Sequence, residues 1–385
     1  MTSPSLTSPA LVHDGIVFGA AFAATALMTP LARRAAIRFG IMDRPAPNKF
    51  HQQATPYLGG LVVAGAVLIL IGAEVTENPS VRMQILAIGL GGLAVSLVGL
   101  IDDWRVLGAL PRLAVQAGAG IGLWAAGVRL APTGFVPLDL AVTVLIVLAV
   151  TNAINLLDNM DGLSAGTTAV IALFFFVVAA SQGQELVTAM ALALAGGCLG
   201  FIPYNFHPAR IFLGDAGTLF LGFLLSVLFI KVKMVGYPLV TRTAVPLLLV
   251  TVPLFDTVLV IVSRWRAGRP VFRGGTDHSS HRLHLMLASP ATVAMVTYGA
   301  AAASGAVALG LLAVDRAWVS WLVVGAAALA CVAGLVVFER IYVRGALVSL
   351  EEAPRPKPAG TFASDILAPS RDRLRSQPFL SSGES

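Results

Sequence analysis

A series of apolar stretches, each about as long as a membrane is thick, dominates the sequence. A helix needs about 20 apolar residues to cross the hydrocarbon core. Hydrophobic residues make up 57% of the chain and charged residues only 12%, whereas soluble domains carry about 25% charged residues. A soluble fold could not hide so many apolar side chains. We therefore predict an all-α polytopic membrane protein with about eleven spans, at residues 13–33, 57–75, 83–101, 112–130, 138–157, 164–181, 187–204, 211–230, 243–262, 291–313 and 317–339.

Basic residues set the predicted orientation, because they prefer cytoplasmic loops. We expect the N-terminus outside and the C-terminus in the cytoplasm, with a transmembrane domain over residues 1–345. The cytoplasmic tail, residues 346–385, is rich in Pro, Ser and Arg and is expected to be disordered. The positive charges are spread over many short loops, which excludes a classical nucleic-acid binder despite a net charge of +6. In this orientation only six of the 26 Lys and Arg lie outside: Arg82, Arg129, Lys231, Lys233, Arg242 and Arg316.

Carboxylate and amide side chains gather at the inner ends of the predicted spans. Charged groups near a membrane are costly and usually mark a functional site. We therefore expect the chemistry of this protein at the cytoplasmic face. The residues are Asp102 and Asp103 at the end of the third span, Asn152, Asn155, Asp158 and Asp161 at the end of the fifth, and Asp215 at the start of the eighth.

The adjacent carboxylates of Asp102 and Asp103 repel each other unless a cation or a shared proton intervenes. Bound Mg²⁺ or a raised pKa is therefore expected, and a solvated helix end with Arg105 as partner is the alternative. Asp215 follows Phe212-Leu-Gly, where glycine permits close backbone approach and a helix N-terminus attracts phosphate. A carboxylate there could hold Mg²⁺ against a substrate phosphate, although an acid that merely favours the helix dipole would look the same.

The segment Asn152-x-x-Asn155-x-x-Asp158-x-x-Asp161 is more specific. In a continuous helix Asn152, Asn155 and Asp158 would share a broad face, and Asp161 would lie on the opposite side. Gly162 allows the helix to end near Asp158 and curl, which would return Asp161 to the same cleft. A polar helix cap is the alternative, but four amide and carboxylate groups exceed what a cap requires.

Two inner loops carry further polar residues. His278 and His281 are three residues apart and could share a helix face. With Arg282 they suit phosphate or sugar hydroxyls better than zinc, for which no suitable third ligand is spaced. A solvated loop is the alternative there. Lys49 and His51 lie in a basic, proline-rich loop and could contact phosphate or a base, although such a loop is unremarkable by itself.

Asp256 is the one acidic residue deep within a predicted span. Pro253 could kink that span and create a bent groove. An internally paired structural carboxylate is an equally good interpretation of Asp256.

Taken in order, these motifs resemble those of the polyprenyl-phosphate N-acetylhexosamine-1-phosphate transferase family, which includes WecA- and TagO-like enzymes and the peptidoglycan translocase MraY. The resemblance runs from about Lys49 to His284. It covers the aspartate pair, the Asn-x-x-Asn-x-x-Asp segment, the Phe-Leu-Gly-Asp turn at Phe212–Asp215, the Pro-Leu-Phe-Asp stretch at 253–256 and the His-x-x-His loop.

The resemblance implies transfer of an N-acetylhexosamine-1-phosphate from a UDP-sugar to an undecaprenyl-type polyprenyl phosphate, with release of UMP. It places this reaction in the bacterial plasma membrane, as the first membrane step of cell-envelope polysaccharide synthesis. Asp215 and Asn155 would hold Mg²⁺, or Mn²⁺ in its place, and Asp102 would deprotonate or orient the lipid phosphate with support from Asp103. The substrate-binding residues would be Lys49, His51, Thr55, Asn152, Asn155, Asp158, Asp161, Phe212, His278, His281 and Arg282.

The separated Asp-His-Ser-Ser-His-Arg form of the last inner loop favours UDP-GlcNAc, because the translocase branch is associated with a run of adjacent histidines. Transfer of phospho-MurNAc-pentapeptide remains the alternative. An ion-coupled transporter is a remote alternative, since its acids would lie near the midplane within symmetric halves. Asn159 stands where many members have glycine, so the local turn there is in doubt. The sequence leaves a homodimer open.

Overall fold

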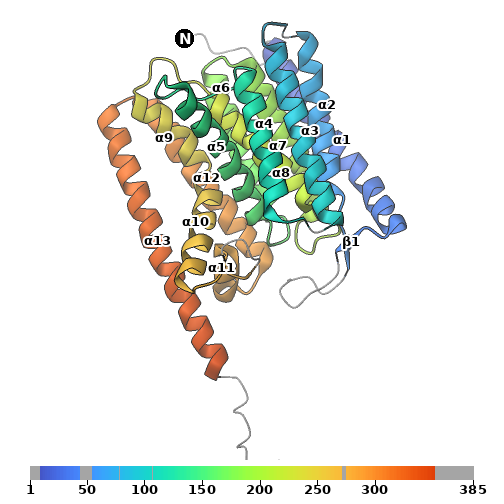
Figure 1. The fold of residues 1–385 in the computed structure, drawn as a ribbon, viewed down its shortest axis with the longest axis vertical. Helices are drawn as coiled ribbons and strands as arrows, with labels where there is room; N and C mark the ends of the chain where they lie inside the picture. The colour runs from blue at the N-terminus through green and yellow to red at the C-terminus, as the bar shows by residue number, and fades with distance from the viewer. Residues whose placement is uncertain (1–8, 44–53, 78, 106, 271–274, 352–385) are drawn as a thin grey trace, which may run out of the picture. The chain divides into compact units, whose positions relative to one another are not determined.

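The computed structural model describes residues 9–43, 54–77, 79–105, 107–270 and 275–351 (Figure 1). These residues form α-helices joined by short loops, with one short 3₁₀ helix and one antiparallel pair of two-residue strands. The elements are α1 Pro9–Phe39, β1 Met42–Asp43, β2 Thr55–Pro56, α2 Gly59–Glu77, η1 Pro79–Val81, α3 Arg82–Trp104, α4 Ala109–Ala125, α5 Val136–Leu157, α6 Leu163–Ser181, α7 Glu185–Asn205, α8 Gly214–Lys231, α9 Leu239–Leu249, α10 Thr251–Arg266, α11 Ser279–Leu287, α12 Pro290–Val314 and α13 Ala317–Glu351.

The core of the bundle is built around α7 and α8. Both helices are apolar on every side, and such helices are stable only when they are surrounded by other helices. Helix α8 packs against α2, α3, α5, α6 and α7, and α7 packs against α1, α2 and α6. Most residues of both helices are buried. The start of α8 is therefore held in place from several directions, which matters for the site described below.

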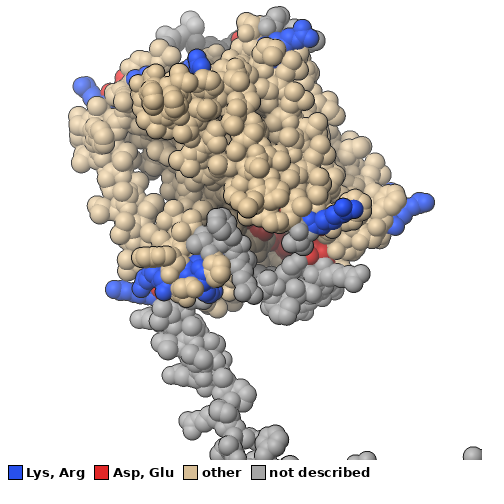
Figure 2. Space-filling model, in the orientation of Figure 1, with Lys and Arg blue, Asp and Glu red and all other residues tan. Residues whose placement is uncertain are grey.

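Eight helices among the described residues are long and apolar enough to cross a membrane, and the bent pair α9–α10 brings the number to nine. The predicted eleven spans all coincide with helices, but α2 and α4 are shorter than a full span by this measure. Lengths alone therefore do not establish eleven crossings. In Figure 2 the Lys and Arg side chains lie toward the ends of the bundle, and the surface between them is uncharged. The chain is a multi-pass membrane protein.

The predicted kink in the ninth span is confirmed, with its centre slightly before the proline. Helices α9 and α10 meet at an angle of 72°, and Val250 separates them. Pro253 occupies the first turn of α10, where a missing N–H costs little. Because Pro253 cannot donate to the carbonyl of Leu249, the helix cannot run straight through this point. The bend leaves Asp256 facing the loop that precedes α11.

Close backbone contacts seat the start of α8 against α2 and α3. A Cβ atom added to Gly99 would lie 2.3 Å from the carbonyl oxygen of Asp215, and one added to Gly60 would lie 2.2 Å from the backbone nitrogen of Gly217. Any side chain at either position would push the helices apart. Because Gly99 precedes Asp102 and Asp103 by about one helical turn, this contact delivers the aspartate pair to the first turn of α8.

The chain divides into two compact units, Met1–Tyr342 and Val343–Ser385. The contacts described below all lie within the first unit. The predicted domain boundary at residue 345 falls inside α13, which continues to Glu351. The rest of the predicted disordered tail lies outside the described residues, as do Lys49 and His51.

Candidate functional site

Asp103 caps the N-terminus of α8 from a different helix. Its Oδ1 accepts a hydrogen bond from the backbone N–H of Asp215 at 2.8 Å, and its Oδ2 accepts one from Ala216 at 3.1 Å. The hydroxyl of Tyr57 in turn donates to the carbonyl oxygen of Asp103. The sequence led us to expect the start of α8 to attract phosphate. Instead, two of its N–H groups are already satisfied by Asp103.

Arg112, near the start of α4, joins Asp102 to Asp215. Its Nη1 lies 2.8 Å from Asp102 Oδ2 and 3.0 Å from Asp215 Oδ2. Asp102 Oδ1 also accepts the backbone N–H of Leu107, which fixes the chain after α3. Two carboxylates from helices far apart in sequence therefore share one guanidinium at the surface end of the bundle.

Asn155 holds the other side of Asp215. Its Nδ2 donates to Asp215 Oδ1 at 2.7 Å and to the hydroxyl of Thr218 at 2.8 Å, which uses both hydrogens of the amide. Asn152 does not join this group, although the spacing of the motif predicted that it would share a face with Asn155. Its Nδ2 donates to Gln116 Oε1 at 2.6 Å, so it faces α4.

Helix α5 ends at Leu157 with Asp158 as its C-cap, as predicted. Gly162 has a φ of +74°, the left-handed conformation expected of the glycine that lets the chain curl into α6. The half-buried Asp158 lies close to other carboxylates. Burial, followed by the charges of Asp215, Asp103 and Asp161, raises the pKa of Asp158 to about 8. This cluster of acids therefore contains more negative charge than Arg112 balances.

Asp161 comes back toward this cluster but is tied to the loop between α7 and α8. His207 Nδ1 lies 2.7 Å from Asp161 Oδ2, and the backbone N–H of Ala209 donates to the same oxygen at 3.0 Å. Asp161 thus joins the turn after α5 to the chain that leads into α8. Figure 2 shows acidic side chains at the surface near β1, at this end of the bundle.

The segment before α2 runs beside the segment before α8. The backbone N–H of Phe212 donates to Pro56, and the N–H of Gly59 donates to the carbonyl oxygen of Phe212. Thr55 is buried and Phe212 is half-buried. These two predicted substrate-binding residues therefore lie in segments that pair with each other, although α5 and several other helices separate them in sequence.

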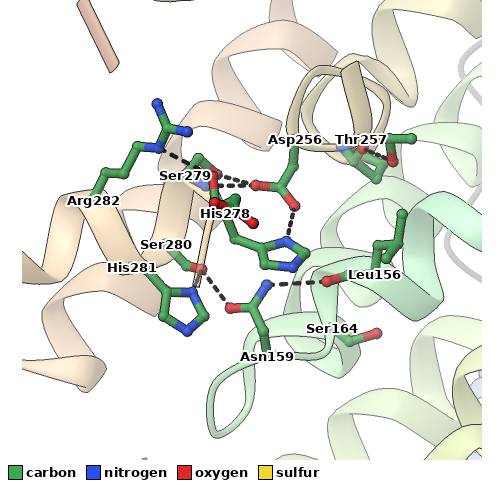
Figure 3. Close-up of polar contacts among 12 residues, drawn as sticks. Leu156, Asn159, Ser164, Asp256, Thr257, His278, Ser279, Ser280, His281 and Arg282 are labelled. Carbon is green, nitrogen blue, oxygen red and sulfur yellow. Dashed lines mark hydrogen bonds and ion pairs between the residues drawn. The ribbon is translucent and has the colours of Figure 1, made fainter. Parts of the chain in front are cut away.

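Helix α11 presents the histidines, and its first residues are bonded to α10 (Figure 3). Asp256 accepts hydrogen bonds from the backbone N–H and the hydroxyl of Ser279, and His278 Nδ1 lies 2.8 Å from Asp256 Oδ2. The hydroxyl of Ser280 donates to Asn159 Oδ1. Asn159 has no positive φ, so the turn that the sequence analysis questioned does not need glycine. Since Asn159 follows Asp158 directly, this bond links α11 to the acidic cluster.

The rings of His278 and His281 lie 5.6 Å apart. Burial and then the neighbouring His278 lower the pKa of His281 to about 4. His281 is therefore a neutral imidazole at physiological pH, which can form hydrogen bonds but does not act as a fixed cation.

Arg282 differs from the prediction that it meets the diphosphate or the sugar. Its side chain is fully buried. Its guanidinium donates to the carbonyl oxygen of Asp277, to the hydroxyl of Ser263 and to Glu339 Oε1. Direct contact with a substrate would require these bonds to break, because no atom of Arg282 is accessible. In this structure Arg282 anchors α11 to α10 and α13.

The donor set fits a hard cation that retains substrate or water ligands. Mg²⁺ usually takes one or two protein carboxylates together with phosphate oxygens. Asp215 offers a carboxylate, and Asn155 offers an amide oxygen that accepts no hydrogen bond from the described residues. No group of three His, Cys, Asp or Glu side chains suited to a closed metal site occurs among those residues. The arrangement thus suits an open magnesium site better than a structural zinc site.

Two residues of the acidic cluster were missed by sequence reasoning. In the sequence Arg112 is one more basic residue of the inner loops, although an arginine at the end of a predicted span is as costly near a membrane as the acids are. Thr218, one turn after Asp215 on α8, has no signal in the sequence that separates it from other buried threonines.

Comparison with known proteins identifies the family. Residues 85–233 match the model of Glycosyl transferase family 4, a range that includes the whole acidic cluster. A probable undecaprenyl-phosphate N-acetylglucosaminyl 1-phosphate transferase of Bacillus subtilis is 34% identical over 273 residues, which cover 67% of this chain and 73% of the relative. The chain belongs to this transferase family. The predicted resemblance to the polyprenyl-phosphate N-acetylhexosamine-1-phosphate transferases is thereby confirmed.

Other family members carry two kinds of name. A decaprenyl-phosphate N-acetylglucosaminephosphotransferase of Mycolicibacterium smegmatis is 34% identical, with 67% of this chain and 72% of the relative covered. A phospho-N-acetylmuramoyl-pentapeptide-transferase of Moorella thermoacetica is 35% identical, with 58% of this chain and 76% of the relative covered. Family membership therefore leaves the choice of sugar to other arguments.

Proposed function

We propose that the protein transfers N-acetylglucosamine-1-phosphate from UDP-GlcNAc to a polyprenyl phosphate and releases UMP. The observation that carries this proposal is the Asp102–Arg112–Asp215 bridge at one end of the bundle, inside the region that matches the family. There a carboxylate at the membrane surface, a guanidinium and a cation-competent carboxylate lie within hydrogen-bond distance of one another. Such a site can bring together a lipid phosphate and a soluble sugar nucleotide.

We assign a role in the transfer to each of the following residues. The lipid phosphate binds Arg112, which releases Asp102 to orient that phosphate or accept its proton. A lipid phosphate oxygen then forms a bond to the phosphorus that carries the sugar, while the bond from that phosphorus to UMP breaks. Phe212, Thr55, Asp158 and Asp161 line the nucleotide side, and the neutral His281 donates a hydrogen bond to the sugar or diphosphate. Arg282 holds α11, which carries His281, against α10 and α13.

Asp215 and the Oδ1 of Asn155 would hold Mg²⁺, or Mn²⁺ in its place. The bound ion would offset the charge of the diphosphate, which the crowded carboxylates of the cluster would otherwise repel. Asp103 keeps the first turn of α8 in place, so that Asp215 is presented with a fixed direction.

We place the site at the cytoplasmic face of the bacterial plasma membrane, because the uneven distribution of Lys and Arg favours that orientation. Cysteines at two exposed positions test it in a variant with Cys331 replaced by alanine. Ala267→Cys, in the loop after α10, should resist a membrane-impermeant maleimide in intact cells and react after permeabilisation. Val235→Cys, in the loop after α8, should react in intact cells. The reverse pattern would put the acids on the wrong side of the membrane.

A phospho-MurNAc-pentapeptide translocase is the second candidate, since the Moorella thermoacetica relative carries that name. The separated histidines on α11 favour the smaller sugar nucleotide. Membranes that contain the protein should convert radiolabelled UDP-GlcNAc and polyprenyl phosphate to a labelled lipid and UMP, and chelation of divalent cations should stop the reaction. Membranes with the Asp215→Asn variant are the matched control. Labelled lipid from UDP-MurNAc-pentapeptide but not from UDP-GlcNAc would select the second candidate.

A further inference from the structure

The N-terminus of α11 is held by a carboxylate from another helix. Asp256 lies on α10, beyond the 72° bend, and is only 1% exposed. One of its oxygens accepts the backbone N–H of Ser279 at 2.7 Å and the Ser279 hydroxyl at 2.6 Å. Free N–H groups at the start of a helix require such acceptors, and α11 has no cap from its own preceding side chain. Asp256 therefore serves as the missing cap.

The second oxygen of Asp256 fixes a histidine. His278 Nδ1 lies 2.8 Å from Asp256 Oδ2, and His278 is 5% exposed. The two hydrogen bonds that Asp256 accepts from Ser279 favour its ionised form, which acts only as an acceptor. Nδ1 must then carry the proton, which turns the opposite ring nitrogen, Nε2, toward the interior wall formed with Asn159 and His281 (Figure 3). Both the orientation and the tautomer of the ring follow from this one contact.

We infer that Asp256 is a positioning residue for the transfer reaction, which caps α11 and holds His278 with Nδ1 protonated and Nε2 available to the substrate. The inference rests on the proposed function, because it assumes that His278 and His281 contact the sugar nucleotide. Asn159 adds a second tether on the other side, through its bond to Ser280. The two tethers come from α10 and from the turn beside Asp158, so they set the distance between the histidines and the acidic cluster.

Fold stability alone does not account for this arrangement. A buried carboxylate bonded to an imidazole gains little over a well-packed apolar pair, because removing the charge from water is costly. Thr257, the next residue on α10, has a polar group that is bonded within the same helix. Its hydroxyl donates to the carbonyl oxygen of Pro253 in its own helix. Thr257→Val therefore removes a polar contact from the neighbouring, half-buried position without touching α11, and it is the matched control.

Nitrogen NMR of the full-length protein labelled at histidine tests the inference without any enzyme assay. His278, assigned by the loss of its signals in His278→Gln, should show a protonated Nδ1 in the wild type. In Asp256→Asn the amide can still cap Ser279 through its oxygen, but its NH₂ group then faces Nδ1, so the proton should move to Nε2. Thr257→Val should leave the wild-type signals in place. A wild-type His278 protonated only at Nε2 would overturn the inference, whatever the variants do.

Kinetics then separate positioning from general damage. Asp256→Asn should lower kcat/KM by about 10–100-fold, the range found when the partner that orients a metal-bound histidine is removed. In a His278→Gln background the same substitution should cost less than about threefold, because residues that act through one another are not additive. Equal losses in both backgrounds would show that Asp256 does not act through His278. If the wild type shows the expected tautomer but transfers no sugar phosphate, the proposed function fails and the positioning contact stands.

Discussion

The acidic cluster at the start of α8 and the network of charged residues and histidines around α11 are both largely buried, but they balance charge differently. Around α8, the described residues include five aspartates close together with one guanidinium among them, and burial raises the pKa of Asp158 to about 8. Around α11, each carboxylate has a cationic partner or a histidine, and burial is offset by these contacts, which lower the pKa of Asp277. The pairs are Asp256 with His278, Asp277 with Arg264 and Arg269, and Glu339 with Arg282 and Arg266.

A charged cluster that is balanced internally needs nothing from outside and can serve as a rigid support. A cluster with surplus negative charge is completed only by a cation or a proton, so it is the place where a metal ion and a charged substrate would alter the energetics most. This difference supports the proposed function, with the chemistry at α8 and its neighbours and a supporting role for α11.

The largest effect should come from Asp102. Asp102→Asn keeps an oxygen that can accept the N–H of Leu107. It removes one of the two carboxylate charges that share the guanidinium of Arg112. Transfer should fall by about 10²–10⁴-fold, the usual contribution of a group that moves or orients a proton, while affinity for UDP-GlcNAc stays nearly constant. Radiolabel transfer and calorimetry on the purified variant measure the two quantities. A matching loss of nucleotide affinity would move Asp102 to the nucleotide side.

Asp215→Asn should come next. The substitution keeps the size of the side chain and a contact with Arg112 or Asn155, but it removes a ligand charge. Turnover at limiting Mg²⁺ should drop by about 10²–10³-fold, as expected when one preorganised electrostatic contact is lost. Titration of turnover against Mg²⁺ should show a shifted midpoint, with the protein still inserted and folded. Wild-type turnover at limiting Mg²⁺ would remove Asp215 from the metal site and weaken the contrast with α11.

Glu339→Ala tests the opposite side of the comparison. It leaves the fully buried Arg282 without its carboxylate, so unfolding should become easier by about 3 kcal/mol, the lower end of the range for a broken buried pair, because Glu339 keeps some solvent contact. Unfolding in graded detergent measures the loss. Arg340→Ala, at the exposed next position, should change stability by less than about 0.5 kcal/mol. Equal stability of the two variants would mean that the network on α11 is not a support.

Asp161→Asn should have a smaller and more selective effect. The variant loses a charged acceptor that bonds His207 and Ala209, a contact worth about 1.5–3 kcal/mol. Nucleotide affinity should weaken, because Asp161 lies on the proposed nucleotide side and joins the turn after α5 to the chain that leads into α8. Transfer should recover at least partly at high UDP-GlcNAc. Calorimetry alongside transfer rates distinguishes this from Asp102→Asn. An inactive variant with unchanged nucleotide affinity would place Asp161 with the chemistry instead.

Much of the acidic cluster could be predicted from the sequence, because costly charges at span ends have few explanations other than a site. The end of α5 near Asp158 could also be predicted, because Gly162 allows the chain to curl there. The pairing of Asn152 with Gln116 was not foreseen, since each three-residue step rotates the side chain by about 60°. That rotation is enough to turn Asn152 toward α4 while Asn155 meets α8.

The polar loop residues were harder to predict for a different reason. Arg282 looks solvated in sequence, and only the three-dimensional packing of α10, α11 and α13 shows it fully buried. Arg112 looks like one more basic residue of an inner loop, and its role depends on the distance between α3 and α8, which no local pattern encodes. Residues that act across helices are visible only once the helices are packed.

The smallest effect, and the most direct measure of surplus charge, should come from pH and Asp158. Its pKa is raised from 3.8 to about 8 in the fold, so the folded protein binds a proton there that the unfolded chain has lost. Stability should therefore fall as pH rises from about 4 to 8 and then level off. Asp158→Asn should remove this fall, so that the variant melts at a higher temperature than the wild type at pH 8 and at nearly the same temperature at pH 4. Added Mg²⁺ should narrow the gap at pH 8, because a cation in the cluster relieves the same repulsion. A gap that is independent of both pH and Mg²⁺ would show that the acids around α8 are balanced after all, and the distinction between the two clusters would be lost.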